Sequence, residues 1–399
     1  MTDATIVSID GTEQSEQPED CQVEVIEFIN EFDKHFVDRR SEIVAIMAAF
    51  LAKEHVFILG PPGTAKSMLA RAIAKALGKT YFEYLVSKTT LPDEVLGPYS
   101  VTKLMNDEFY RKTEGYLPTC EVVLLDEVWK CNHALLNTLL CVVNERKFHN
   151  GLVVEDVPLE TMITASNELP EDDTLNAIYD RFMVRLNVKW AGDPADRKRI
   201  VFGPAPNPQC TLSSKSLEEL RSKVAAFLEN DNDEFEDALI EISEALKNEG
   251  LEYSDRRWRQ TVPILAAHSV LSGYGKLEVE SFEILADLLW GKPEDRPTIV
   301  RVVSKIANPV LNEVQELYDA AKELVSQLPN PKESRAEFLD GGSTILEQLE
   351  NIGKQASVIS SRQDRVSGSV DTLIGGIRQM WTDLQERLNH EIFRGRGLD

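Results

Sequence analysis

The sequence predicts an α/β fold, with a parallel sheet in the first half of the chain and only helices after it. Short apolar runs at His55–Leu59, Val122–Leu125 and Thr161–Ala165 alternate with helical patterns over the first 200 residues. Alternating strands and helices of this kind favour a parallel sheet whose faces are covered. After a proline-rich connector near residues 203–215, the apolar residues recur only at helical spacing.

These patterns divide the chain into four parts. Residues 1–20 are polar and acidic, which predicts a disordered tail. Residues 21–202 hold the alternating strands and helices, residues 203–305 are expected to form a separate helical domain, and residues 306–399 a helical extension. In the extension, apolar residues repeat at a 4-3-4-3-4 spacing that fits either a short coiled coil or an ordinary packed helix: Val366, Val370, Leu373, Ile377, Met380 and Leu384.

Composition and charge narrow the class of protein. The 399 residues include 67 acidic and 43 basic side chains, a formal net charge of -24, which disfavours a general polyanion binder. The five cysteines are odd in number and form no CxxC pair, so we expect reduced thiols and neither a disulfide framework nor a zinc site. Without a signal-peptide pattern or a run of about 18 apolar residues, the expected location is the cytoplasm.

The strongest motif lies between the first apolar run and the helical pattern that follows it: Gly60, Pro61, Pro62, Gly63, Thr64, Ala65, Lys66 and Ser67. Backbone N–H groups in such a loop, together with the N-terminus of the next helix, attract phosphates. We therefore expect Lys66 to contact the β- and γ-phosphates of ATP and the Ser67 hydroxyl to ligate Mg²⁺. The common pattern has glycine in place of Ala65, where a methyl group is tolerated if the backbone angles are ordinary.

Further polar groups follow the other two apolar runs. Asp126 and Glu127 come directly after Val122–Leu125, so they are expected at the carboxyl edge of the sheet, beside the phosphates. Asp126 is predicted to hold Mg²⁺ through water, and Glu127 to polarise the attacking water. Asn167 lies just past Thr161–Ala165 and is predicted to orient that water, although an isolated polar residue there more often forms a turn.

With these motifs in place, the chain resembles the MoxR-type AAA+ ATPases and is most similar to their RavA-like branch. Six ordered blocks carry the resemblance over about residues 35–305: GPPGTAKS from Gly60, LLDEVWK from Leu124, LLNTLLCVVNERKFHNG from Leu135, TASNELPE from Thr164, YDRFMVRL from Tyr179 and SDRRW from Ser254. The resemblance implies an AAA+ core with a helical lid, and hydrolysis of ATP with Mg²⁺ in a homo-oligomeric ring, expected to be a hexamer. It also implies chaperone-like action on a client protein, and a partner with a von Willebrand A domain.

The same resemblance implies roles for single residues. Arg181 matches the arginine finger that a neighbouring subunit inserts into the site. Arg256 matches the sensor arginine of the lid, with Arg257 the alternative one residue later. Residues 101–118 match the helix-2 insert, a hairpin directed at the pore of the ring, whose aromatic residues are expected either to grip a client or to pack the hairpin itself: Phe109, Tyr110 and Tyr116.

Two other classes of function fit the same motifs. AAA+ rings with a helix-2 insert include nucleic-acid motors, which the acidic composition disfavours. A non-hydrolysing, ATP-gated scaffold is the second, and the presence of Glu127, Asn167 and Arg181 argues against it. RavA-like proteins can also carry a β-rich module after the lid, whereas residues 310–399 show only helical spacing, so docking of a partner through that module is not expected.

Overall fold

The computed structural model describes residues 20–170, 173–230, 232–329, 334–360 and 368–394, so all but the last residue of the predicted tail lies outside the described part. The chain divides into two compact units. The sheet unit comprises the chain up to residue 232 together with 253–293. The helical unit comprises residues 233–252 together with the chain from 294 onward.

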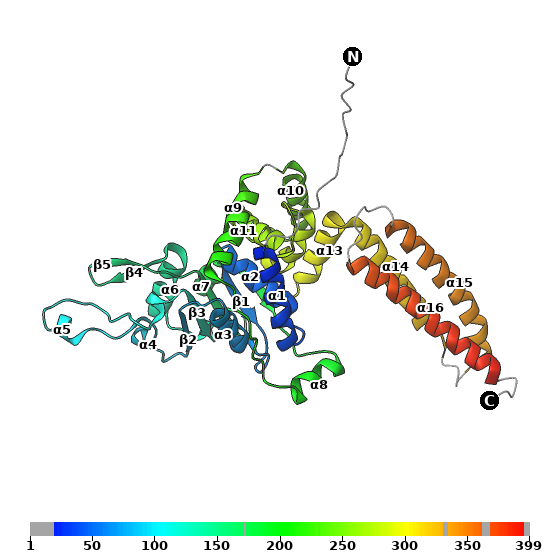
Figure 1. The fold of residues 1–399 in the computed structure, drawn as a ribbon, viewed down its shortest axis with the longest axis horizontal. Helices are drawn as coiled ribbons and strands as arrows, with labels where there is room; N and C mark the ends of the chain where they lie inside the picture. Colours follow the sequence, from blue (N-terminus) through cyan, green and yellow to red (C-terminus); the bar gives the residue numbers. More distant parts are fainter. Residues whose placement is uncertain (1–19, 171–172, 231, 330–333, 361–367, 395–399) are drawn as a thin grey trace, which may run out of the picture. The chain divides into compact units, whose positions relative to one another are not determined.

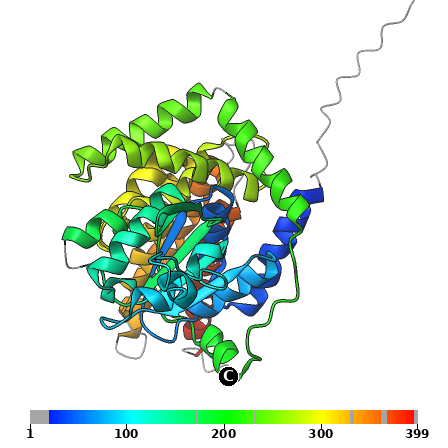
Figure 2. The ribbon, with the colours of Figure 1, turned by 90° about the vertical axis from the view of Figure 1, so that its left-hand side faces the viewer.

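A five-stranded parallel sheet forms the centre of the sheet unit, in the order β2-β3-β6-β1-β7. Its strands are β1 His55–Leu59, β2 Tyr81–Leu85, β3 Val122–Asp126, β6 Thr161–Ser166 and β7 Phe182–Asn187. Figure 2 shows these strands side by side, seen from the side of α5 and β4. The three strands predicted from apolar runs are the three central ones, because a strand paired on both edges and covered on its faces is apolar throughout.

The sequence patterns missed the two outer strands. The edge strand β2 has half-buried side chains and no apolar run. The other edge strand, β7, has Arg185 in its middle, and this buried charge interrupts the apolar signal. The Arg185 guanidinium donates to the carbonyl oxygens of Trp290 at 2.7 Å and Phe182 at 3.2 Å, so its burial is compensated.

Helices surround the sheet, with α3 packed on β2, β3 and β6, and α2 packed on β1 and β7. The α-helices of the sheet unit are α1 Asp20–His35, α2 Arg40–Leu51, α3 Lys66–Ala76, α4 Pro92–Leu96, α5 Val101–Leu104, α6 His133–Glu145, α7 Asp173–Tyr179, α8 Pro194–Phe202, α9 Ser214–Glu229, α11 Asp255–Leu271 and α12 Leu285–Leu288. Short 3₁₀ helices lie at η1 Leu117–Thr119, η2 Val128–Lys130 and η3 Val279–Ile284. The 3₁₀ helix η3 is followed directly by α12, which is a single α-helical turn. The predicted fold class, a parallel α/β sheet followed by helices, is confirmed.

Two hairpins extend from the sheet unit on the side where α4, α5, β4 and β5 lie in Figure 1. One is residues 97–116, which include α5 and an isolated bridge between Tyr99 and Arg111. The other is the antiparallel pair β4 Lys147–Asn150 and β5 Val153–Asp156. The first hairpin occupies most of the region that the sequence assigned to the helix-2 insert.

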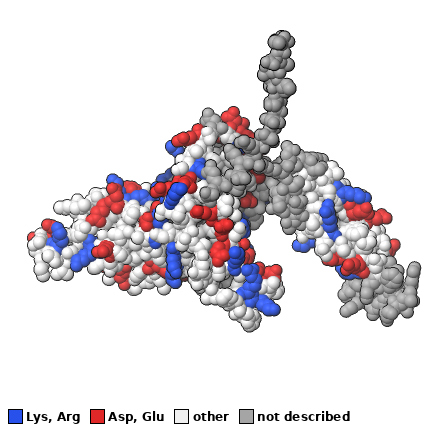
Figure 3. All heavy atoms as spheres, viewed as in Figure 1, with Lys and Arg blue, Asp and Glu red and all other residues white. Residues whose placement is uncertain are grey.

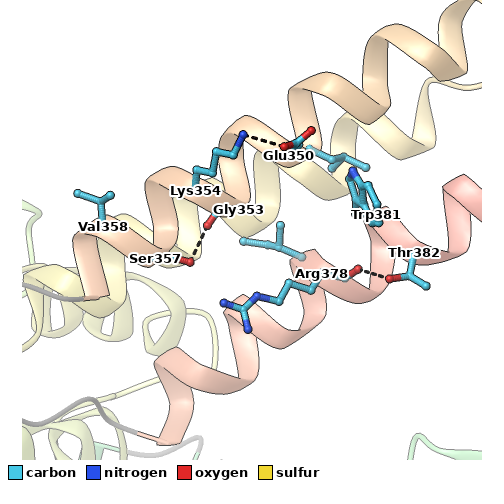
Figure 4. Close-up of a pocket in the computed structure, with 10 residues that line it drawn as sticks. Glu350, Gly353, Lys354, Ser357, Val358, Arg378, Trp381 and Thr382 are labelled. Carbon is cyan, nitrogen blue, oxygen red and sulfur yellow. Dashed lines mark hydrogen bonds and ion pairs between the residues drawn. The ribbon is translucent and has the colours of Figure 1, made fainter.

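The helical unit contains α10 Asp233–Asn248, α13 Arg296–Ala307, α14 Pro309–Ser326, α15 Arg335–Ser360 and α16 Gly368–Arg394. Val366, the first residue of the predicted seam, lies outside the described residues. Val370, Ile377 and Leu384 of that seam are buried in a core shared by α14, α15 and α16, as expected of an ordinary packed helix. Between α15 and α16 lies a cavity of about 830 Å³, with Trp381 and the ion pair of Lys354 with Glu350 in its lining (Figure 4). Among the described residues, no helix combines the length and hydropathy needed to span a bilayer.

Candidate functional site

The loop at residues 60–65 connects β1 to α3, and Lys66, the first residue of α3, donates hydrogen bonds back to it. Lys66 Nζ donates to the carbonyl oxygens of Gly60 at 2.8 Å and Pro61 at 3.0 Å. Thr64 Oγ1 donates to the same Pro61 oxygen at 2.9 Å. Burial lowers the pKa of Lys66, and the nearby carboxylates of Asp126 and Glu127 oppose that shift. The lysine is thus held at the N-terminus of α3, where backbone dipoles favour a phosphate.

Ala65 does not meet the condition under which the sequence analysis expected a methyl group to be tolerated. Its backbone is left-handed, with φ 63° and ψ 20°, so it does not have the ordinary angles under which a methyl group is tolerated freely. A residue with a side chain costs about 1–2 kcal/mol in the left-handed backbone conformation, which is the reason that glycine is common at such positions. The loop therefore holds local strain beside the lysine.

Ser67 and Asp126 meet at the carboxyl edge of the sheet, where Ser67 Oγ donates to Asp126 Oδ2 at 3.1 Å. A hydroxyl and a carboxylate are hard oxygen ligands, which suit Mg²⁺. Magnesium commonly takes only one or two protein carboxylates and completes its shell with water and substrate phosphates. The donor set at this position therefore fits the ion that the sequence predicts.

Glu127 and Asn167 lie at the same edge. Glu127 follows β3 in a left-handed conformation, with φ 56°, and its N–H donates to the carbonyl oxygen of Ala165 at 2.7 Å. Its carboxylate forms an ion pair with Lys130 Nζ at 3.1 Å. Asn167 is exposed one residue past β6, and the register pairs Leu59 of β1 with Ser166 of β6. The phosphate loop, the carboxylates of Asp126 and Glu127, and the amide of Asn167 are thus brought to the same edge of three adjacent strands.

The predicted arginines lie at the opposite, amino edge. Arg181 directly precedes β7, whose first residue pairs with His55 at the start of β1. Its Nε and Nη1 atoms are buried without a hydrogen-bond partner among the described residues. Arg256 is exposed in the first turn of α11 and attracts the carboxylate of Glu54, which precedes β1.

Arg257, the alternative sensor, is buried instead of exposed. Its guanidinium donates to Asp180 Oδ1 at 3.1 Å and also to the carbonyl oxygens of Met183 and Leu288. Burial, aided by the nearby Arg185 guanidinium, lowers the pKa of Arg257. Its contacts join α11 to the start of β7. Of the two adjacent arginines, only Arg256 is free to reach another molecule.

Comparisons with known proteins bear on the family to which this chain belongs. Residues 23–202 match the model of the MoxR domain in the MoxR-vWA-beta-propeller ternary systems, and residues 234–303 match an AAA lid domain. An uncharacterized protein of Methanocaldococcus jannaschii, MJ0812, is 34% identical over 84% of this chain and 89% of its own length. The chain belongs to the MoxR family of AAA+ ATPases.

Other relatives of this MoxR-family protein are more distant. The chaperone MoxR1 of Mycobacterium tuberculosis is 23% identical over 44% of this chain and 46% of its own length. A crystal structure of a candidate ATPase from Cytophaga hutchinsonii has a TM-score of 0.58 and 17% identity, covering 72% of this chain and 95% of the other. That likeness bears on the fold alone.

A cavity beside the phosphate loop escaped the sequence analysis. It has a volume of about 630 Å³ and adjoins Gly63, Thr64 and Ala65. The walls come from the connection between α1 and α2, from α3, and from the segment around α8, and they include Phe36, Val37, Met68, Trp190, Ile200 and Val201. Trp190 Nε1 donates to the Pro62 carbonyl oxygen at 3.4 Å. No motif marks these residues, because they share neither a strand end nor a spacing.

The predicted insert aromatics divide into two groups. Tyr110 Oη donates to Glu155 Oε1 at 3.0 Å, and the Tyr116 ring lies near that of Phe82, so both rings pack within the protein. Phe109 is 64% exposed. Of these three aromatics of the MoxR-family chain, Phe109 is therefore the most exposed to a partner, and its ring makes an edge contact with Tyr99 at a centroid distance of 6.1 Å.

Proposed function

We propose that this MoxR-family protein binds MgATP and hydrolyses it between the subunits of a homo-oligomeric ring, expected to be hexameric, to remodel or activate a partner protein. One observation carries the proposal: the two sets of predicted catalytic groups lie at opposite edges of one sheet. A strand of five residues, as in β1, spans about 16 Å at a rise of about 3.3 Å per residue. A second subunit is therefore needed to bring Arg181 to a phosphate held at Lys66.

The carboxyl edge supplies binding and the attacking water. Residues Gly60–Ser67 would surround the phosphates, with Lys66 leaving its two carbonyl partners for the β- and γ-oxygens. Glu127 would take the proton of the attacking water, and Asn167 would orient that water. Mg²⁺, held by Ser67 and, through water, by Asp126, would neutralise charge on the phosphates.

The amino edge of the neighbouring subunit would complete the site. Arg181 would offset the charge that develops on the transferred phosphoryl group. Its Nε and Nη1 support this role, because a phosphate would supply the acceptors that these two atoms lack among the described residues. Arg256 would be the lid sensor, since Arg257 is committed to Asp180. Residues 203–305 remain our proposal for the lid, although its helices are divided between the two units.

The 630 Å³ cavity is our candidate for the adenine base. Its aromatic and aliphatic walls suit a flat heterocycle, and it adjoins the phosphate loop directly. Arg197 and Arg199 of α8 also line it, and Figure 3 shows Lys and Arg gathered where α8 lies. These cations suit the polyphosphate end or the ribose of a nucleotide.

The partner is proposed from the family. Because the matching domain model comes from ternary systems with a von Willebrand A protein and a β-propeller, we expect a von Willebrand A partner. The exposed ends of the two hairpins are the expected contact for a client. The RavA-like assignment rests on the six sequence blocks.

Mixed rings test the shared site. Arg181→Ala should bind ATP with near-normal affinity and lose turnover, since arginine fingers contribute about 10³–10⁵ in rate in GTPases. Lys66→Ala should lose binding. Mixing the two inactive proteins, with subunit exchange verified, should restore a minor fraction of phosphate release, because an intact loop then meets an intact finger.

Arg185→Ala is no substitute for this test, because Arg185 is buried and held by three carbonyl oxygens. Full activity of Arg181→Ala alone would exclude it as the finger. A mixture that stays inactive after confirmed exchange would contradict a site shared between subunits.

A further inference from the structure

The helix-2 insert and the β4–β5 hairpin are joined through side chains, by Asn150 of β4 and by Tyr110 of the insert, whose Oη donates to Glu155 Oε1 at 3.0 Å. The insert, residues 97–116, is held in its own shape by backbone bonds from Ser100 N–H to Tyr110 O at 2.8 Å and from Lys112 N–H to Pro98 O at 2.8 Å. The β4–β5 pair has its own ladder. Among the described residues, no strand ladder connects the two hairpins, so side chains must do so.

Asn150, at the end of β4, provides the part of this connection that reaches the backbone of the insert. It is only 1% exposed. Its Oδ1 accepts the Arg111 N–H at 2.6 Å, and its Nδ2 donates to the Arg111 carbonyl oxygen at 3.1 Å and to Glu155 Oε1 at 3.1 Å. The side-chain amide thus pairs with both backbone groups of one insert residue, as a neighbouring strand would.

The next residue allows the close approach. Gly151 has φ +66°, and a Cβ added to it would lie 1.9 Å from the carbonyl oxygen of Phe109. Only glycine fits there, both for its conformation and for the space. Two adjacent residues of the β4–β5 hairpin, one polar and one without a side chain, are therefore fitted to the insert.

Both hairpins connect to the edge that holds the ATP motifs. Arg111 donates to the Gly97 carbonyl oxygen at 2.8 Å and pairs with Asp93 of α4. Just before α4, the Thr90 carbonyl oxygen accepts from Asn132 Nδ2 at 2.8 Å, and Asn132 caps α6 a few residues after Glu127. On the other side, β5 is followed by β6, which ends immediately before Asn167.

Each of the two hairpins exposes apolar side chains near its end. Met105 is 80% exposed and Phe109 is 64% exposed on the insert, and Leu152 is fully exposed at the turn of the β4–β5 hairpin. Isolated exposed apolar residues are ordinary, but several of them on two connected hairpins are typical of a contact surface. The relative position of these side chains is fixed only if the two hairpins move together.

We propose that Asn150 and Gly151 clip the insert and the β4–β5 hairpin into one rigid lever, which passes the nucleotide state at Glu127 and Asn167 on to the exposed apolar side chains of the two hairpins. Asn150 is a positioning residue in this scheme, because it touches neither nucleotide nor client. The clip itself depends only on the contacts above, whereas the transmission of nucleotide state rests on the proposed function. Spatial continuity alone does not establish coupling, so the coupling has to be measured.

Hydrogen exchange of the full chain, with and without MgATPγS, tests the lever. In the wild type, binding of the nucleotide should change exchange in residues 97–116 and 147–156 together. Asn150→Ala should speed exchange of the Arg111 amide about tenfold, as expected for the loss of a hydrogen bond of roughly 1.4 kcal/mol. It should also abolish the nucleotide response of the insert, while nucleotide affinity stays within about threefold of wild type.

Gly151→Ala should have the same effect by a different route, through the clash with Phe109. Gly115→Ala is the matched control, since Gly115 also has a positive φ, +80°, but no atom lies within 4 Å of an added Cβ. It should keep the nucleotide response of the insert.

The lever would be overturned if nucleotide binding changed hydrogen exchange in the insert of Asn150→Ala and Gly151→Ala as much as in the wild type. It would also be overturned if the wild type bound nucleotide without any change of exchange in the two hairpins. If the wild type binds no nucleotide, the proposed function and the transmission both fail. Hydrogen exchange without nucleotide then tests the clip alone. An unchanged exchange rate of the Arg111 amide in Asn150→Ala would overturn the clip.

Discussion

The two edges of the central sheet hold their polar groups in different ways. At the carboxyl edge, residues of neighbouring strands and loops meet directly, as where Ser67 Oγ reaches Asp126 Oδ2 at 3.1 Å. At the amino edge, charges are fixed by contacts between elements far apart in the chain, as where Arg257 of α11 donates to Asp180 before β7. The first edge is equipped to bind a phosphate within one chain. The second leaves Arg256 exposed beside buried charges, as expected of a surface that acts on another molecule.

Apart from the mixed-ring test of Arg181, the largest effect is expected at the carboxyl edge, from Glu127→Gln. A carboxamide cannot take a proton from water, so turnover should fall by about 10²–10⁴ while ATP binding is kept. Phosphate release and a direct binding assay measure the two quantities separately. Glu168→Gln, at an exposed carboxylate beside Asn167, is the control and should leave the rate near that of the wild type. Weakened binding with a normal residual rate would make Glu127 a structural residue.

The amino edge is tested by its adjacent arginines. Arg257→Ala should lower the free energy of unfolding by on the order of 3 kcal/mol, because it removes the buried partner of Asp180 and of two carbonyl oxygens. Arg256→Ala should change it by less than about 0.5 kcal/mol, as for an exposed side chain, and should instead lower ATP turnover. Denaturant unfolding and phosphate release give the two readouts. The reverse pattern would identify Arg257 as the sensor.

Glu54 makes the amino edge sensitive to pH. Burial raises its pKa to about 7, although Arg146, Arg256 and Arg257 favour the charged form and Gln260 donates a hydrogen bond. Because the folded protein holds this proton more tightly than the unfolded chain does, stability falls as pH rises from about 4.5 to about 7 and then levels off. Glu54→Gln should remove that loss, so its stability relative to the wild type should grow between pH 5 and pH 8 by about 1–3 kcal/mol.

The quantity to measure is the difference in unfolding free energy between the wild type and Glu54→Gln, because His55 changes the stability of each protein with pH in the opposite direction. Burial, aided by Arg146, lowers the pKa of His55 to about 3, so its contribution is present above about 6.5 and is lost on acidification. This contribution is the same in both proteins and cancels. A stability difference that does not change with pH would show that Glu54 is not protonated in the folded state.

The smallest effect is expected from Ala65→Gly at the carboxyl edge. Glycine relieves the left-handed conformation at φ 63° but adds freedom to the unfolded chain, so a net gain of up to about 1 kcal/mol is expected. Ala52→Gly, at a position with φ -77°, is the control and should instead destabilise by up to about 1 kcal/mol. A loss of stability in Ala65→Gly would show that the methyl group packs favourably enough to outweigh the strain.

Much of the carboxyl edge could be predicted from the sequence because its geometry is local. A buried strand followed by Gly60–Ser67 and a helix leaves little choice for the loop, and parallel strands bring Asp126 and Asn167 to the same edge. The left-handed backbone of Ala65 could not be predicted, because a left-handed residue other than glycine has no signal in the sequence. Strand β7 was missed because Arg185 is buried by contacts with Trp290 and Tyr179, which no spacing in the sequence reveals.

The sequence by itself determined the fold class, the family and the residues of the phosphate loop, since strand periodicity and loop chemistry depend on neighbours along the chain. The tertiary structure decided which of Arg256 and Arg257 is exposed, because that depends on whether Asp180 lies within reach of α11. It also decided that Asn150 pairs with Arg111, 39 residues away. Such contacts form only when separate elements pack together, and their energies come from burial and hydrogen bonding at that point of contact.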